Sequence, residues 1–423
     1  MAGLHRLLLS LPLFLHSLAL SPAKAAGFAS VSVARRQGIA SPLSARLMER
    51  ERQVLLREGS GPHSGATNGS IWPVAIYWTK IAIGTPPKMF PVAIDSGSGD
   101  LDIQGPNCAN CPKDYPNNVY NPSESTTSKH IFPYYFSNTY QTCDLSDPSA
   151  PCTISGKLFA DSVSFADIDA VQVKLGAITK QTSNFNQFQD ICGVMGLLGS
   201  STSNVFQSMV KAGVVESNVW AICLSQGSEG NGTLTFGGID ERLYNGTVGY
   251  TPNTGGMFYA MELSGGVQIN GVPVDSTVGQ KEAILDSGTN VLLLPTSDFQ
   301  NTKKVFLNSC DPNNNWHGVC DVDADATLFD NKCFEFSEEQ IAAFPIITIA
   351  AKGVNLTMHG ADYLLPSDPR AKSSKELCLG IRPSSAGLFI VGDNTMQNYY
   401  VVFDNEKQQI GWAPVNAKAC GSV

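Results

Sequence analysis

The sequence has few charged residues, and it has no long apolar segment after Leu20. Charged side chains make up only 15% of its 423 residues, whereas glycine and proline together number 63. Runs with helical periodicity are few and brief. This composition favours a β-rich globular enzyme or binding protein and argues against a coiled coil or a disordered scaffold. The length allows two lobes of ordinary domain size.

The main part of the chain also lacks a positive charge balance. Residues 1–60 contain eight basic and three acidic side chains, which leaves residues 61–423 with 20 basic and 34 acidic ones, a net charge of −14. Nucleic-acid-binding domains usually carry a basic patch or stripe that contacts phosphates. The acidic body therefore argues against a nucleic-acid partner.

Two further absences concern metal sites and serine nucleophiles. Cys108 and Cys111 have the spacing of half a zinc site, but the sequence has no second pair with matching spacing. We therefore expect no metal and no cofactor. A nucleophilic serine needs a positioned histidine, and none of the six histidines lies in a motif of that kind.

Residues 1–25 have the pattern of a cleaved signal peptide. An apolar stretch from Leu7 to Leu20 follows Arg6 and precedes the small-residue segment Ala23-Lys24-Ala25. A membrane anchor is the alternative, but the stretch is short and is interrupted by proline, histidine and serine. We expect a protein of the secretory pathway, extracellular or in a lysosome or vacuole, without a transmembrane anchor.

Eleven cysteines agree with that compartment, because spaced cysteines in a secreted chain usually form disulfides. Four Asn-X-Ser/Thr sequons predict glycosylation on surface loops. These candidate glycosylation sites are Asn68, Asn231, Asn245 and Asn355.

Residues 26–69 form a basic arm in front of the acidic body. Six arginines outnumber three glutamates there, and the arm has no lysine. Apolar residues between Leu43 and Leu55 fall near one helical face, and a Gly/Ser-rich piece from Gly59 to Ser70 ends the pattern. We interpret the arm as a propeptide; a solvated N-terminal helix is the alternative.

From Ile71 onward, the sequence has the pattern of short strands. Apolar runs are broken by Gly, Pro, Asn and Asp, as in YWTKIAIGTPP (77–87) and GTLTFGGID (232–240). Strands this short and this regularly interrupted predict antiparallel sheets. Two brief segments, SNVFQSMVKAG (203–213) and SEEQIAAF (337–344), predict helices.

One pattern occurs twice in the chain. FPVAIDSGSGDLDI (90–103) runs from an apolar strand into Asp95, and KEAILDSGTNVLLLP (281–295) does the same at Asp286, 191 residues later. Two hydrophobic residues and a glycine follow at similar distances and end at Gly196 and Gly392. A single Asp-Ser-Gly would indicate only a turn at the end of a strand. Its repetition predicts two halves packed around an approximate two-fold axis, each contributing one aspartate.

Two aspartates at such an axis would lie within a few Å of each other. Both cannot ionise easily, so the pair would hold a single proton over an acidic range. The ionised member can then act as general base on a water molecule while the protonated member donates to a carbonyl oxygen. This chemistry hydrolyses a peptide bond without a metal or a covalent intermediate.

The residues after each aspartate suit this arrangement. Gly97 and Gly288 allow the two loops to approach closely. Ser98 and Thr289 carry hydroxyls, which we expect to form hydrogen bonds across the axis and to hold the carboxylates in place.

In their order along the chain, these motifs resemble those of pepsin-family aspartic endopeptidases. The resemblance runs from about Tyr77 to Pro414 and includes both Asp-Ser-Gly motifs, TYQT (139–142), GVMG (193–196), FIVGD (389–393) and YYVVFDNEKQQIGWAPV (399–415). It implies an all-β, bilobal fold with two lobes of six-stranded-barrel type, pseudo-two-fold symmetry and a few short helices. The N-terminal lobe would span residues 70–250 and the C-terminal lobe residues 251–423.

The resemblance also implies roles for particular residues. Asp95 and Asp286 would be the catalytic pair, and the dyad of this family is the established example of two carboxyls that share one proton. Tyr140 falls at the tyrosine of the flap, the hairpin that closes over substrate, and Phe185 falls in the S1 pocket. We expect a monomeric zymogen that is inhibited by its own propeptide and that cleaves extended peptides or proteins at acidic pH.

Cysteine pairs follow from the same resemblance. Cys333 with Cys378 fits a disulfide that is common in the C-terminal lobe, and Cys223 with Cys420 fits a link seen in β-secretases. Three local pairs would be Cys108 with Cys111, Cys143 with Cys152, and Cys310 with Cys320. Cys192 would then remain as a buried thiol.

Three features depart from the family pattern. Asp102 stands where family members usually have a tryptophan that is hydrogen-bonded to the flap tyrosine. The usual glycine-rich flap tip is replaced by QTCDLSDPSAPCTISG (141–156), in which Asp144 and Asp147 would bring negative charge near the cleft. Many relatives inhibit themselves with a propeptide lysine, so an arginine would have to take that role here.

Two other functions fit part of the pattern. A secreted binding protein can keep the fold without activity, but such proteins typically lack one catalytic aspartate or its neighbouring glycine, and this chain has both of each. A glycosidase could also use two carboxylates, but these loops offer no aromatic platform for a sugar. The sequence therefore predicts an aspartic endopeptidase, with a catalytically silent binding protein as the alternative.

Overall fold

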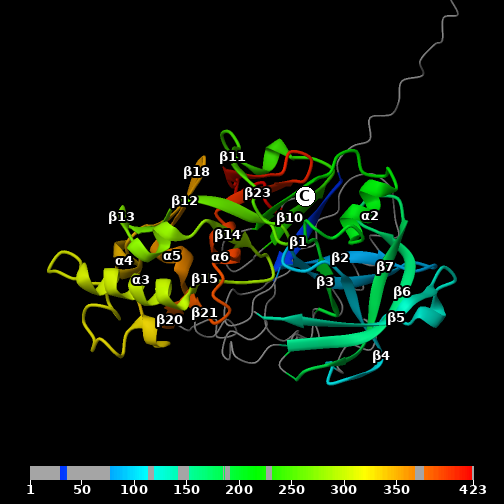
Figure 1. The fold of residues 1–423 in the computed structure, drawn as a ribbon, viewed down its shortest axis with the longest axis horizontal. Coiled ribbons are helices and arrows are strands. Elements are labelled where there is room, and N and C mark those ends of the chain that lie inside the picture. Colours follow the sequence, from blue (N-terminus) through cyan, green and yellow to red (C-terminus); the bar gives the residue numbers. More distant parts are fainter. Residues whose placement is uncertain are drawn as a thin grey trace, which may run out of the picture.

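The computed structural model describes residues 29–35, 77–112, 119–141, 152–183, 185, 191–224, 231–366 and 376–421. Strands dominate these residues and the helices are short, so the predicted all-β fold is confirmed. The two halves of the chain lie side by side, with β1, β10 and β23 between them (Figure 1). The predicted signal peptide, Asn68 and Cys143 lie outside the described residues, as does most of the predicted propeptide.

The largest sheet has thirteen strands from both ends of the described chain. They are β1 (Ala29–Arg35), β2 (Tyr77–Ile83), β3 (Lys88–Asp95), β4 (Leu101–Ala109), β5 (Lys129–Tyr140), β6 (Cys152–Ser164), β7 (Val171–Gln181), β8 (Gly193–Gly196), β9 (Val219–Leu224), β10 (Asn231–Phe236), β11 (Gly249–Pro252), β23 (Tyr399–Asp404) and β24 (Gln409–Pro414). Their order in the sheet is β11-β24-β23-β9-β10-β1-β2-β3-β8-β4-β7-β6-β5.

Two smaller sheets and the helices complete the described fold. The eight-stranded sheet contains β12 (Ala260–Ile269), β13 (Val272–Pro273), β14 (Glu282–Leu285), β15 (Leu292–Pro295), β17 (Ile347–Ala351), β18 (Val354–Met358), β21 (Ile381–Ser384) and β22 (Ile390–Val391). The three-stranded sheet contains β16 (Cys333–Glu335), β19 (Leu364–Pro366) and β20 (Glu376–Leu379). The helices are α2 (Val205–Lys211), α3 (Thr296–Asn308), α4 (Glu338–Ala343), α5 (Gly360–Tyr363) and α6 (Asp393–Met396).

The two helices that the sequence predicted are present as α2 and α4. Helix α2 begins after Asn204, whose side chain accepts a hydrogen bond from Gln207 N at 2.8 Å, and Ser337 caps α4 in the same way. Helix α3 was not predicted. It buries Phe299, Thr302 and Phe306, which share one face, but polar residues separate them in the sequence.

The strand pairing repeats in the two halves, as the duplicated motif predicted. Strand β3 pairs in parallel with β8, and β14 pairs in parallel with β22. The strand that follows each Asp-Ser-Gly motif pairs antiparallel with the same neighbour: β4 pairs with β8, and β15 pairs with β22. Each aspartate therefore lies where the first of two strands that flank a shared neighbour ends.

The repeated glycines at the ends of β8 and β22 allow a close approach of backbone segments. A Cβ atom on Gly196 would lie 2.5 Å from the carbonyl oxygen of Ser98, and one on Gly392 would overlap the carbonyl oxygens of Thr289 and Val291. Main-chain hydrogen bonds join the same segments, from Leu197 N to Asp95 O at 2.7 Å and from Asp393 N to Thr289 O at 2.8 Å. These glycines therefore fix the backbone on which each aspartate loop rests.

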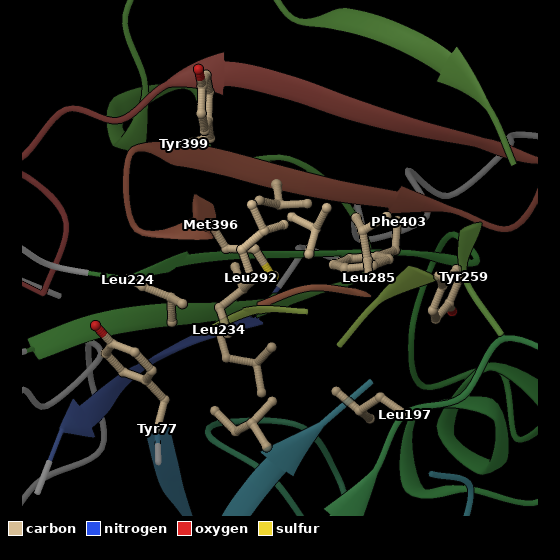
Figure 2. Close-up of a cluster of buried hydrophobic side chains, with 14 of the residues drawn as sticks. Tyr77, Leu197, Leu224, Leu234, Tyr259, Leu285, Leu292, Met396, Tyr399 and Phe403 are labelled. Carbon is tan, nitrogen blue, oxygen red and sulfur yellow. The ribbon is translucent and has the colours of Figure 1, made fainter. Parts of the chain in front are cut away.

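One hydrophobic core extends through both halves. Leu197, Leu224 and Leu234 come from the first half and Leu285 and Leu292 from the second, and all five are buried in the same cluster (Figure 2). Burial of each such leucine contributes about 2 kcal/mol to stability. The halves are thus held together by apolar packing as well as by paired strands.

The central part of the large sheet mixes distant parts of the sequence. Strand β23 pairs with β9, so the last strands of the chain lie in the sheet that contains most of the N-terminal strands. Strand β1, which belongs to the predicted propeptide, pairs antiparallel with β10 through six residue pairs and with β2 through two. Among the described residues, no helix is long and apolar enough to cross a membrane.

Candidate active site

Asp95 and Asp286 lie at the points where two buried strands end. Asp95 is the last residue of β3, and Asp286 follows the last residue of β14. The exposed fraction of each aspartate is small, 6% for Asp95 and 8% for Asp286. The apolar residues before each aspartate keep its backbone in the core, while the Ser-Gly that follows turns the chain away.

The two carboxylates face each other across the contact between the halves. A Cβ atom on Gly97 would lie 2.7 Å from Oδ1 of Asp286, and a Cβ atom on Gly288 would lie 2.8 Å from Oδ1 of Asp95. Each carboxylate therefore packs against the glycine of the opposite loop. This close approach leaves no room for a side chain at either position.

Hydrogen bonds from the chain hold both carboxylates. Gly97 N donates to Oδ1 of Asp95 at 2.8 Å, and Gly288 N donates to Oδ1 of Asp286 at the same distance. The hydroxyl of Thr289 donates to Oδ2 of Asp286 at 2.6 Å. The equivalent main-chain bonds in the two loops show that the local structure around each aspartate is duplicated.

Ser96 and Ser287 join the two loops across the axis. Ser96 N donates to the hydroxyl of Ser287 at 3.1 Å, and Ser287 N donates to the hydroxyl of Ser96 at 2.9 Å. The Ser96 hydroxyl donates to Leu285 O, and the Ser287 hydroxyl donates to Ile94 O, each at 3.0 Å and each in the opposite half. Four buried hydrogen bonds thus fix the separation of the loops that carry the aspartates.

This arrangement corrects one expectation. We expected Ser98 and Thr289 to form bonds across the axis and to hold the carboxylates. Ser96 and Ser287 form bonds across it, and Thr289 holds the carboxylate of its own loop. The Ser98 hydroxyl lies beside Asp95 and partly opposes the rise in its pKa, although its geometry is not that of a regular hydrogen bond. The sequence could have indicated the role of Ser96 and Ser287, because a serine stands between Asp and Gly in both motifs.

The surroundings of the pair favour a proton on Asp95. Burial is the main cause that raises the pKa of Asp95, to about 7 from 3.8, and the negative charge of Asp286 is the second. The hydrogen bond from Gly97 N opposes part of this rise. Asp95 is therefore protonated at acidic pH and can act as a proton donor.

Tyr140 and Phe185 lie together, and Tyr140 lies near Asp95. Tyr140 ends strand β5, and its ring lies 5.2 Å from that of Phe185, centroid to centroid, with a tilt of 40°. Phe185 belongs to a buried cluster with Trp78 and Ile154, against which Tyr140 packs. Burial raises the pKa of the Tyr140 phenol well above its ordinary value, and the charges of Asp102 and Asp95 add to this effect, so the phenol keeps its proton.

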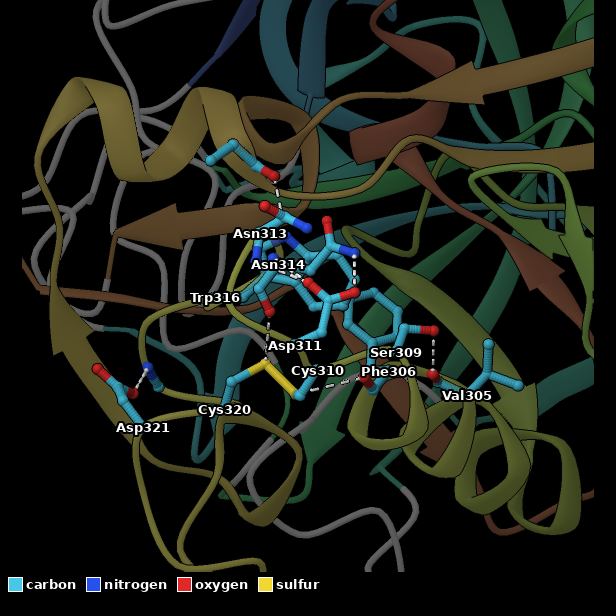
Figure 3. The surroundings of a disulfide bond; sticks show 12 residues. Val305, Phe306, Ser309, Cys310, Asp311, Asn313, Asn314, Trp316, Cys320 and Asp321 are labelled. Carbon is cyan, nitrogen blue, oxygen red and sulfur yellow. Dashed lines mark hydrogen bonds between the residues drawn. A yellow bond between two sulfur atoms is a disulfide. The ribbon is translucent and has the colours of Figure 1, made fainter.

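Four of the cysteine pairs that the resemblance implied are joined in the structure. They are Cys108–Cys111, Cys223–Cys420, Cys310–Cys320 and Cys333–Cys378. The bond between Cys310 and Cys320 closes a loop in which Asp311 accepts hydrogen bonds from Asn313 N and Asn314 N (Figure 3). Cys192 is a buried free thiol whose pKa is raised by burial.

The remaining site residues are one cysteine pair and the candidate glycosylation sites. The pairing of Cys143 with Cys152 stays a prediction because Cys143 is not among the described residues. Asn245 and Asn355 are exposed, as a glycosylation site requires. Asn231 begins β10, and its pairing with Ala34 of β1 places it within the central sheet.

Comparison with known proteins identifies the family of this chain. The family model described as eukaryotic aspartyl protease matches residues 76–415, a range that contains Asp95, Asp286 and Tyr140. Pepsin A from Suncus murinus is 26% identical over 344 residues, which cover 80% of this chain and 81% of that protein. Cathepsin E-B from Xenopus laevis is 27% identical over 349 residues, which cover 80% of this chain and 79% of that protein.

Proposed function

This chain belongs to the eukaryotic aspartyl protease family, and on that premise we propose that it is an endopeptidase in which Asp95 and Asp286 hydrolyse peptide bonds. The observation that carries the proposal is the opposition of the two carboxylates, each packed against the glycine of the other loop. Buried hydrogen bonds between Ser96 and Ser287 support it, because they hold the two carboxylates at a fixed separation.

The reaction divides the two roles between the aspartates. Asp286 accepts hydrogen bonds from Gly288 N and Thr289 Oγ1, donors that suit a carboxylate, and it takes a proton from the attacking water. The water oxygen forms a bond to the peptide carbonyl carbon while Asp95 donates its proton to the carbonyl oxygen. In the second step the C–N bond breaks, the amine leaves with the proton held by Asp286, and Asp95 regains its proton from the hydroxyl.

Apolar side chains near Asp95 would set the substrate preference. Tyr140 lies near Asp95 and packs against the buried apolar cluster that contains Phe185, so an apolar side chain beside the cleaved bond would lose its hydration there. An extended peptide would lie between the β5–β6 hairpin, which is the proposed flap, and the two aspartates. The enzyme would therefore prefer apolar residues flanking the cleaved bond.

The precursor would be a zymogen whose arm is part of the central sheet. Strand β1 lies within the proposed propeptide, residues 26–69, and occupies a position between β10 and β2. Removal of the arm would leave both neighbouring strands without a partner there. The basic charge of the arm opposes the acidic body, and neutralising body carboxylates at low pH would weaken that attraction.

Acid-triggered processing can be measured directly. The purified precursor is incubated at pH 4 and at pH 7, and the new N-terminus is determined by mass spectrometry. Faster processing at pH 4, with cleavage between Gly59 and Trp72, is the expected result. Equal processing at both pH values would contradict the acid trigger and would leave cleavage after Arg35-Arg36 by another protease as the route.

The proposed route is the secretory pathway, with residues 1–25 as a signal peptide. The four joined cysteine pairs support it, because such disulfides persist in oxidising compartments. The mature enzyme would act as a monomer on protein substrates, either outside the cell or in an acidic compartment.

Activity is tested with the processed enzyme on a denatured protein across pH 3 to 7. Wild type, Asp95→Asn and Asp286→Asn are compared, with a pepstatin-type peptide as a transition-state mimic. Loss of general acid or base catalysis should lower kcat by roughly 10²–10⁴-fold in each variant. Asp169→Asn, in the exposed turn after β6, is the matched control and should keep full activity.

Two outcomes would overturn the assignment. Full activity in either aspartate variant would show that the pair is not catalytic. A wild-type enzyme that cleaves nothing after removal of its arm, yet binds the pepstatin-type peptide, would instead identify a catalytically silent binding protein.

A further inference from the structure

A third aspartate is buried near the proposed catalytic pair, and the reaction described above does not use it. Asp102 lies on β4, and its exposed fraction is 0%. It pairs with Gly176 of β7 on one side and with Val194 of β8 on the other. A carboxyl in the middle of a sheet with apolar neighbours is costly unless it is neutral or well paired.

The surrounding residues leave room for this carboxyl. A Cβ atom on Gly176 would overlap Oδ1 of Asp102 and would lie 2.5 Å from the ring of Phe136. Among the described residues, Oδ1 of Asp102 has no hydrogen-bond partner. The structure thus provides space for one carboxyl oxygen in a fully buried site, and the described residues offer that oxygen no donor.

The other carboxyl oxygen contacts the proposed flap. Asn138 Nδ2 donates to Oδ2 of Asp102 at 2.9 Å and lies 3.3 Å from Oδ2 of Asp100. Asn138 is on β5, two residues before Tyr140, so the two side chains leave the strand on the same face. Asp102 follows the Asp95 loop on β4. The Asn138–Asp102 bond therefore joins the flap strand to the segment that carries Asp95.

The charged and titratable groups that face Asp102 come from three segments. Asp100 lies on the same segment and is paired with Lys174 of β7, with Nζ and Oδ1 3.1 Å apart. Tyr140 faces it from β5, and β8 contributes the apolar Val194. Burial is the main cause that raises the pKa of Asp102, to about 8, and the charge of Asp100 adds to it. The Asn138 hydrogen bond and Lys174 oppose this rise.

We propose that Asp102 is a positioning residue that keeps the flap strand β5 against the Asp95 loop while its carboxyl is neutral, and that loss of its proton releases the strand. The physical reason is that Asp102 is fully buried and one of its carboxyl oxygens has no donor among the described residues. A second negative charge beside Asp100 is therefore relieved only if the strand moves and water enters. The proposal rests on the proposed function, because it assigns Tyr140 and its strand to the covering of substrate.

The first test does not depend on catalysis. Hydrogen exchange of the 129–164 hairpin is measured by mass spectrometry at pH 5 and pH 9, corrected for the intrinsic pH effect, in wild type, Asp102→Asn and Asp169→Asn. Exchange in the hairpin should rise at pH 9 in wild type and in the Asp169→Asn control. It should rise much less in Asp102→Asn, whose side chain has the same shape but cannot ionise. Equal pH dependence in all three proteins would overturn the proposal.

The second test uses binding and turnover. In wild type, the charged form of Asp102 must regain a proton before the flap closes over a pepstatin-type peptide. The Kd of wild type divided by the Kd of Asp102→Asn should therefore increase about tenfold at one pH unit above the pKa of Asp102. The same ratio of KM values should rise with pH while the ratio of kcat values changes less. A constant Kd ratio from pH 5 to pH 9 would contradict the proposal.

A second variant separates positioning from folding. Asn138→Ala removes the donor but leaves Asp102 in place, and it should increase hairpin exchange at pH 5 as well as at pH 9. If Asp102→Asn fails to fold, as judged by circular dichroism, this variant still decides the question, because unchanged exchange at pH 5 would overturn the role of the Asn138–Asp102 bond. Absence of all cleavage by wild type would refute the proposed function, whereas the exchange result would stand.

Discussion

Replacement of Gly97 by alanine tests the geometry of the proposed active site most directly. The new Cβ atom would lie 2.7 Å from Oδ1 and 2.8 Å from Cγ of Asp286. Ordinary contacts of a Cβ atom begin at 3.4 Å, so the carboxylate must move by about 0.7 Å. The backbone at Gly97 is not in the left-handed region, so alanine meets no conformational penalty there.

The expected loss follows from that displacement. A misplacement of about 1 Å at a reacting group can cost about 10²-fold in rate. We therefore expect Gly97→Ala to lower kcat/KM by about 10- to 100-fold. Overpacking of this size destabilises a protein by about 1–3 kcal/mol, so the variant should still fold.

The assay compares kcat/KM of processed wild type, Gly97→Ala and Gly279→Ala on one fluorogenic peptide at acidic pH, with thermal unfolding of each. Gly279 is an exposed glycine where a Cβ atom would meet nothing within 4 Å, so this control should match wild type. If Gly97→Ala kept its activity within twofold, the two carboxylates could not be packed as described, and the argument for the pair would fail.

Three further predictions concern stability. Ser287→Ala leaves the buried Ser96 N and Ile94 O without their partners across the axis. In a urea titration it should lower the free energy of unfolding by about 2–4 kcal/mol. A loss below about 0.5 kcal/mol would refute the role of these bonds. Changing Cys223 and Cys420 together to serine opens a crosslink with a sequence separation of 197 and should cost up to about 5 kcal/mol by loop entropy, which would appear as a lower Tm. The pKa of Asp102 is raised in the folded state to about 8, so the unfolded state binds fewer protons. The free energy of unfolding should therefore fall as the pH rises from about 4 to about 8. The decrease between pH 4 and pH 7 should be up to about 4 kcal/mol. Asp102→Asn should flatten that part of a pH–stability curve, and an unchanged curve would contradict the assignment.

The duplicated motif made much of the fold predictable. Two Asp-Ser-Gly segments after apolar strands, with matching glycines downstream, indicated two similar halves, and the parallel pairs β3–β8 and β14–β22 have that repetition. Helix α3 was missed because Phe299 and Phe306 are separated by polar residues, and its face becomes buried only against neighbouring strands. Local patterns predict elements well where their periodicity is strong, and poorly where tertiary contacts supply the burial.

The sequence by itself determined that this chain has two aspartates in equivalent turns, because a repeat can be read without knowing where its copies lie. It also determined that small residues follow both of them, which permits a close approach. Only the tertiary structure decided which hydroxyls cross the axis, because the direction of a serine side chain depends on its rotamer and on a partner 191 residues away. It also decided that Asp102 is buried beside the flap strand, since the burial of a carboxyl depends on the strands packed on both sides of it and not on its neighbours in the chain.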